Sequence, residues 1–135
     1  MPISIVRVTN ETRRRVLSER CAVARTLIPR VRGLLGRTGL EDGEGLFIAP
    51  CPSIHMFGMK FPLDVIFVTK ENVVTDFVEN IAPGKAYMAK ANAGKAHAAL
   101  ELPIGTIRDT STQVGDVLLF EETTDRTTPV AGDAS

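Results

Sequence analysis

The chain has few of the features that mark secreted or membrane-spanning proteins. Two cysteines among 135 residues are too few for a secreted disulfide scaffold. The N-terminus has no apolar core of a secretory signal, and no apolar run approaches the ~20 residues that span a bilayer. We therefore expect a cytoplasmic protein with reduced thiols and no membrane partner.

Aromatic residues are missing from the segment that would otherwise suggest nucleic-acid binding. The chain has 16 basic and 16 acidic residues, but residues 1–39 carry nine arginines against Glu11 and Glu19. No aromatic side chain lies there for bases to stack on, and the arginines alternate with apolar residues as on the solvated face of a folded element. We expect no nucleic-acid partner.

A phosphate-binding loop is also missing. Gly33, Gly36 and Gly39 lack the preceding strand and the spacing that such a loop requires. The sequence therefore predicts no cofactor.

Short β-branched runs separated by glycine and proline dominate what is present. Leu63–Thr69 and Val73–Glu79, joined by three residues, predict an antiparallel hairpin. Residues 3–9 and 14–20 predict another. We expect further strands at residues 46–49, 86–89, 96–102 and 116–121. Residues 105–111 should form a turn or a short helix.

One segment has a helical pattern. Apolar residues within 22–35 recur with the spacing of a single helix face. Pro29 suits only the first turn of a helix, so the helix should begin near Leu27 or Ile28, and Gly36 or Gly39 would end it. The prediction is one mainly β domain over residues 1–122, an antiparallel β sandwich or barrel with one short N-terminal helix, followed by a disordered tail at 123–135.

The segment Cys51–Val68 holds half of the histidines, cysteines and methionines of the chain. Polar side chains in an apolar, β-rich run are costly to bury unless they are paired, so the segment is either a site or a satisfied core network. We expect a non-catalytic domain that binds an unknown small polar molecule in a groove beside residues 51–64. The predicted ligand-binding residues are His55, Met59, Lys60, Asp64 and Glu101.

Two alternatives remain for this segment. Cys51, His55 and Met59 offer a thiolate, an imidazole and a thioether that copper would accept. On an extended strand residues four apart lie ~13 Å apart, so a metal site would require a loop. The third hypothesis is a hydrolase that uses Cys51 with His55 or His97, or a pair of carboxylates.

Asp64 and Glu101 are each flanked by apolar residues. Strand alternation favours a carboxylate that faces water while its neighbours pack inward. If both pointed inward, they could converge to bind a cation or act as acid and base. For Asp64 we also expect a structural role, because a carboxylate that opens a strand after a proline can accept backbone N–H bonds.

Several short motifs occur together in a characteristic order, and the set resembles the domain of unknown function 192 family. They span roughly residues 30–120 and are Arg32-Gly33-Leu34-Leu35-Gly36-Arg37, Gly43-Glu44-Gly45-Leu46, Met59-Lys60, Pro62-Leu63-Asp64, Ile66-Phe67, Leu100-Glu101-Leu102-Pro103 with Gly105, and Gly115-Asp116. The resemblance implies a compact, jelly-roll-like, mainly β domain. The family has no established reaction, so the resemblance assigns no catalytic residue.

Overall fold

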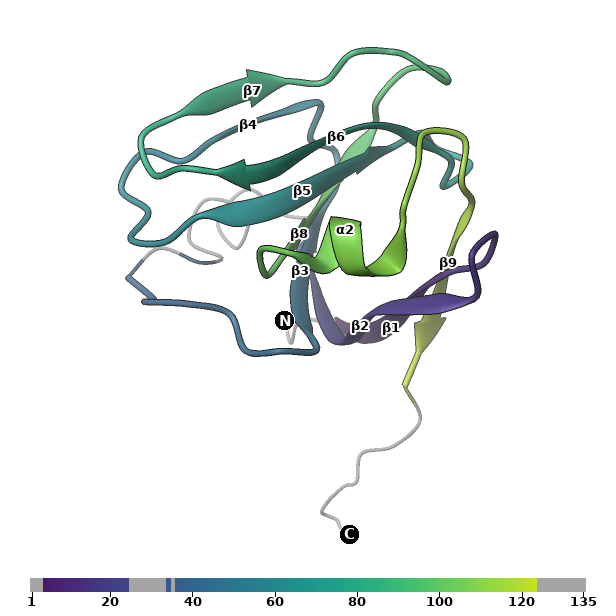
Figure 1. Ribbon diagram of the computed structural model, residues 1–135, viewed down its shortest axis with the longest axis horizontal. Helices are drawn as coiled ribbons and strands as arrows, with labels where there is room; N and C mark the ends of the chain where they lie inside the picture. Colours follow the sequence, from purple (N-terminus) through teal and green to yellow (C-terminus); the bar gives the residue numbers. More distant parts are fainter. Residues whose placement is uncertain (1–3, 25–33, 35, 124–135) are drawn as a thin grey trace, which may run out of the picture.

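The computed structural model describes residues 4–24, 34 and 36–123, which form nine strands and one short helix (Figure 1). In this part of the chain no helix is long and apolar enough to cross a membrane. The elements in chain order are β1 (Ser4–Asn10), β2 (Arg15–Ala24), β3 (Glu44–Ile48), β4 (Ser53–His55), β5 (Leu63–Val68), β6 (Val74–Ile81), β7 (Ala86–Met88), β8 (Ala98–Leu102), α2 (Thr106–Thr110) and β9 (Leu118–Glu122).

Seven strands form one curled sheet in the order β6-β5-β8-β3-β2-β1-β9, a half-barrel that wraps around α2 (Figure 1). The prediction of an antiparallel fold is wrong for one pair. β2 and β3 are parallel, with Cys21 beside Gly45 and Val23 beside Phe47. A parallel pair requires a long crossover, and the chain between residues 24 and 44 connects the two strands.

The two ends of the sheet approach each other at one rim of the half-barrel. Val73, just before β6, forms an isolated bridge with Val117, just before β9. Next to this bridge, the buried Asp116 carboxylate accepts hydrogen bonds from Asn10 Nδ2 (2.9 Å) and Arg13 Nε (2.9 Å). These hydrogen bonds stabilise the rim, because the Asp116 carboxylate would be costly to bury without donors.

Strand alternation gives the sheet two buried faces. On β8, Leu100 and Leu102 pack on the face that holds Ile107 of α2. Ala99 packs on the opposite face, and Glu101, two residues further along the strand, points the same way. The sheet therefore separates two hydrophobic cores, and β8 contributes a carboxylate to the second one.

The pair β4–β7 covers this second face. The Tyr87 ring of β7 stacks on Phe67 of β5, with ring centroids 5.9 Å apart. Its hydroxyl donates to Asp76 Oδ2 (2.7 Å), which also accepts the Lys90 N–H (2.8 Å). These contacts attach the small layer to the large sheet.

Most predicted strands are confirmed, including the β5–β6 hairpin, and the predicted turn or helix near residues 105–111 is α2. Residues 22–24, where the helical pattern starts, belong to β2. The predicted helix, from near residue 27 or 28 to Gly36 or Gly39, lies outside the described residues except for Leu34 and its end at residues 36–39, and so do residues 124–135 of the predicted tail. The sequence analysis did not predict β4, a three-residue strand with Ile54 as its only buried residue.

Candidate functional site

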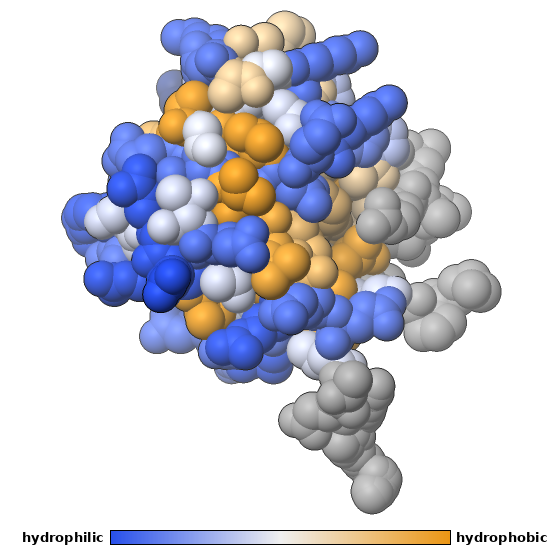
Figure 2. Space-filling view, turned by 90° about the vertical axis from the view of Figure 1, so that its right-hand side faces the viewer, coloured by the Kyte–Doolittle hydropathy of each residue, from blue (hydrophilic) through white to orange (hydrophobic). Residues whose placement is uncertain are grey.

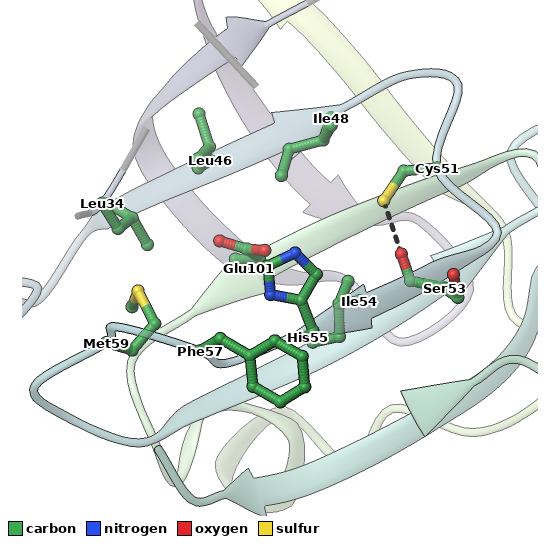
Figure 3. A pocket seen from close by; sticks show the side chains of 10 residues that line it. All are labelled: Leu34, Leu46, Ile48, Cys51, Ser53, Ile54, His55, Phe57, Met59 and Glu101. Carbon is green, nitrogen blue, oxygen red and sulfur yellow. Dashed lines mark hydrogen bonds between the residues drawn. The ribbon is translucent and has the colours of Figure 1, made fainter. Parts of the chain in front are cut away.

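A pocket of about 260 Å³ lies between the second face of the sheet and the β4 segment (Figure 3). β3 and β8 form one side, while β4 and the residues that follow it form the other. Apolar side chains make up most of the lining. Among the described lining residues, the ones that can titrate are Cys51, His55 and Glu101.

Sheet register places Glu101 at the floor of this pocket. Its neighbours across the sheet are Leu46 on β3 and Val65 on β5. Directly paired residues point to the same face, so the carboxylate has an apolar side chain on each side, one from β3 and one from β5. Ile48, two residues after Leu46, extends the apolar wall. The expectation that Glu101 faces water is therefore wrong, because the layer of β4 covers the face to which it points.

Glu101 is only 9% exposed, and Figure 3 shows its carboxylate directed into the pocket. Burial raises the pKa of this carboxyl to about 7. No hydrogen bond or ion pair joins its side chain to any residue that the structure describes. Without a partner, the ionised form loses its hydration and gains nothing in return, which is why the carboxyl holds its proton more strongly than usual.

Two aromatic rings form the outer edge of the pocket. The imidazole of His55 stacks on Phe57, with ring centroids 4.7 Å apart and planes 25° apart. Phe57 is 58% exposed although it is a large apolar side chain. Between them in the chain, Met56 is buried and its N–H donates to the carbonyl of Lys85 (2.7 Å). This anchored backbone presents the two rings on the solvent side of the pocket.

Met59 lies on the same loop and also lines the pocket. The N–H of Met59 donates to the carbonyl of Met56 (3.1 Å) and closes a turn. Gly58 inside this turn has φ +79°, in the left-handed region that favours glycine. The turn brings the half-buried thioether back toward the sheet, opposite the end of the pocket where Cys51 lies (Figure 3).

The three residues of the predicted metal set all line the pocket, but the structure does not bring them together as ligands. Figure 3 places Cys51 and Met59 at opposite ends, with His55 between them. The Cys51 thiol donates to the carbonyl of Ser53 (2.9 Å). Within the described part of the chain, no group of three or more Cys, His, Asp or Glu residues is placed to hold a metal ion. The geometry adds no support to the copper hypothesis.

The other two predicted ligand-binding residues lie outside the pocket lining. Lys60 is exposed. Asp64 is fully buried and accepts the backbone N–H groups of Asn80 (2.9 Å) and Ile107 (3.0 Å). It therefore does not face water, and because β5 alternates, it points to the α2 face, opposite to Glu101. The two carboxylates cannot converge on one ion or act together as acid and base.

Sequence reasoning missed the wall opposite residues 51–64. Leu46 and Ile48 come from β3, and Leu34 comes from the segment before it. The alternating pattern of β3 already indicated that Leu46 and Ile48 share a face. It could not show that this face also carries Glu101, because the pairing of β3 with β8 is a long-range contact.

The comparisons relate this chain to a family of proteins whose activity is not established. The model of the DUF192 family, described as "Uncharacterized ACR", matches residues 6–120. A UPF0127 protein of Thermococcus sibiricus is 32% identical over 117 residues, which cover 83% of this chain and 73% of that protein. A UPF0127 protein of Thermococcus gammatolerans is 31% identical over 121 residues, covering 86% and 76%.

Two solved structures are similar to this chain. A protein of unknown function from Novosphingobium aromaticivorans has a TM-score of 0.70 at 31% identity, over 87% of this chain and 84% of that one. A putative transcription regulator from Sinorhizobium meliloti has a TM-score of 0.71 at 21% identity, over 88% and 94%, a likeness in fold alone. Because the family model covers most of the sequence, the resemblance found in its motifs is confirmed, and the chain belongs to the DUF192 family of uncharacterised proteins.

Proposed function

We propose that this chain is a non-catalytic domain that binds a small molecule in the pocket between β3, β8 and β4. The observation that carries the proposal is Glu101, a buried carboxyl group that faces the pocket and has no partner among the described residues. Burial of a polar group without a hydrogen bond costs on the order of 1–3 kcal/mol. A ligand with a hydrogen-bond donor would remove that penalty.

The lining of the pocket fits the usual composition of a small-molecule site. Such sites are mainly apolar, with a small number of polar groups that orient the ligand. Leu46, Ile48 and Met59 provide apolar walls, while Glu101 and His55 provide the polar groups. The volume of about 260 Å³ lies near the lower end for ligand pockets, so the ligand has the size of one ring.

The chemistry of the lining favours binding over catalysis. A carboxylate mechanism needs two groups that act together, and Asp64 lies on the opposite face of the sheet from Glu101. A cysteine nucleophile needs a thiolate. The Cys51 thiol donates to the carbonyl of Ser53, a backbone oxygen that cannot act as a general base.

We place the protein in the cytoplasm. Cys21 is a fully buried free thiol, as a reducing compartment allows. Burial raises the pKa of the Cys21 thiol to about 12, so this thiol stays protonated and unreactive.

NMR titration of the ¹⁵N- and methyl-labelled protein tests the proposed site. The probes are glucose, AMP, citrate and benzylamine, which differ in charge and in apolar content. We expect at least one of them to shift signals of Leu46, Ile48 and Met59 together. Shifts confined to other regions for every probe would contradict the proposal.

A matched pair of variants locates the binding. Met59→Trp fills the pocket and is expected to abolish the shifts. Met88→Trp makes the same change at a residue that is 76% exposed on β7 and does not line the pocket, so binding should remain. Equal binding by both variants would place the ligand elsewhere.

A further inference from the structure

We infer that the ligand of this pocket is a small organic cation, an ammonium or amidinium group on an apolar body, and that Glu101 is its counter-ion. The inference rests on the proposed binding function and adds the chemical class of the ligand. It is argued from the charges, the walls and the rim of the pocket.

The charges around the pocket are one-sided. Glu101 is the acidic residue of the lining, and no lysine or arginine is among the described residues that line it. Cys51 and His55 are the other groups there that can titrate. Lys60, the nearest lysine in the sequence to His55, is exposed and does not line the pocket. The carboxylate thus lacks a cation from the described chain, and a cationic ligand would supply it.

The protonation state of Glu101 can change when a cation binds. With a pKa of about 7, Glu101 is protonated and ionised in similar amounts near neutral pH. A bound cation favours the ionised form, because an opposite charge at hydrogen-bond distance outweighs part of the burial. A hydrogen bond to this carboxylate is strengthened by its charge whichever group donates, and a cation adds the Coulomb attraction between opposite charges, so a cation gains more than an alcohol does.

The remaining surfaces of the pocket suit the other parts of such a ligand. Leu46 and Ile48 can pack against an apolar body of one ring. At the outer edge, the Phe57 ring stacks on His55 and Phe57 remains 58% exposed. Aromatic faces attract cations, so the rim favours the entry of a positively charged ligand over an anion.

Three probes of nearly equal size test the charge: benzylamine, benzyl alcohol and benzoate. NMR titration at pH 8, where Glu101 is ionised, should give an affinity for benzylamine roughly ten- to hundredfold above that for benzyl alcohol. Benzoate should bind weakest. Lowering the pH to 6 should weaken benzylamine binding and leave benzyl alcohol nearly unchanged, because the carboxylate becomes protonated while the amine keeps its charge.

Two variants assign the preference to one side chain. Glu101→Gln should bind benzylamine and benzyl alcohol about equally. Glu79→Gln, the same change at an exposed residue of β6, should keep the wild-type preference. If Glu101→Gln does not fold, the pH dependence is measured in a His55→Gln variant, which removes the imidazole of the lining and leaves the carboxylate as the group that weakens benzylamine binding at pH 6.

The outcomes separate this inference from the proposed function. If benzyl alcohol or benzoate binds at the pocket as tightly as benzylamine, the inference fails while the binding function stands. If benzylamine shifts no pocket signal, the inference also fails, and the wider probe panel then decides whether the pocket binds anything.

Discussion

Asp64 and Glu101 are two buried carboxyl groups on adjacent strands with opposite surroundings. Asp64 is 0% exposed, points to the α2 face and accepts two backbone N–H bonds. Glu101 is 9% exposed, points to the β4–β7 face and has no partner in the described chain. The fold supplies hydrogen-bond donors to Asp64, whereas the described residues supply none to Glu101. The contrast teaches that burial of a carboxyl group does not by itself indicate a site, whereas burial without a partner does.

Removal of the Asp64 carboxylate should have the largest effect on stability. Asp64→Ala leaves the N–H groups of Asn80 and Ile107 buried without an acceptor, so the free energy of unfolding should fall by about 4 kcal/mol. Asp64→Asn keeps one acceptor oxygen and should cost about half as much. Chemical denaturation measures both variants. Unchanged midpoints would mean that the two hydrogen bonds do not hold β5 to β6 and to α2.

The second largest effect should be a dependence of stability on pH that comes from Glu101. Its pKa is about 7 in the folded protein and 4.5 ordinarily, so the folded state holds the proton more strongly. As the pH rises from 4.5 to 7, the unfolded state loses its proton first, and the wild-type protein loses about 3 kcal/mol of stability. The Glu101→Gln variant lacks this loss.

Denaturation of both proteins at several pH values gives the difference directly. A difference in unfolding free energy that stays constant between pH 4.5 and 8 would contradict the raised pKa.

A smaller effect on stability is expected at Asp76, a carboxylate on the same face as Glu101 that does have hydrogen-bond donors. Tyr87→Phe removes the hydroxyl that donates to Asp76, while the Lys90 N–H still donates to the same oxygen. The free energy of unfolding should fall by about 1 kcal/mol. The hydrogen bond raises the pKa of Tyr87, the single tyrosine of the chain, and an absorbance titration can follow it. A tyrosine that titrates at its ordinary value would show that the bond is absent.

The smallest effect concerns Lys60, which the sequence analysis placed in the site. This lysine is exposed and does not line the pocket. Lys60→Ala should therefore change the free energy of unfolding by less than about 0.5 kcal/mol and leave the benzylamine affinity unchanged. A large loss of affinity would return Lys60 to the binding site.

Local sequence signals predicted the elements that depend on neighbouring residues. The β5–β6 hairpin follows from two β-branched runs and a short turn, and it is present. The parallel pairing of β2 with β3 could not be predicted in this way. It depends on a crossover between residues 24 and 44, whose direction no local pattern encodes.

The candidate site was predictable in part for the same reason. His55 and Met59 belong to the segment that the sequence singled out, and both line the pocket. Glu101 was chosen for its apolar neighbours and also lines it. Lys60 and Asp64 were chosen for their position in the segment, but chain proximity does not determine which face of a sheet a side chain occupies.

The sequence by itself determined that the chain is mainly β, that residues 51–64 carry unusual side chains, and that it resembles the DUF192 family. Only the tertiary structure decided that Asp64 and Glu101 lie on opposite faces and that one of them is partnered. The reason is that alternation along a strand sets only the relative direction of neighbouring side chains. What covers each face, and which hydrogen-bond donors it offers there, depends on how distant strands pair and on where α2 and β4 pack.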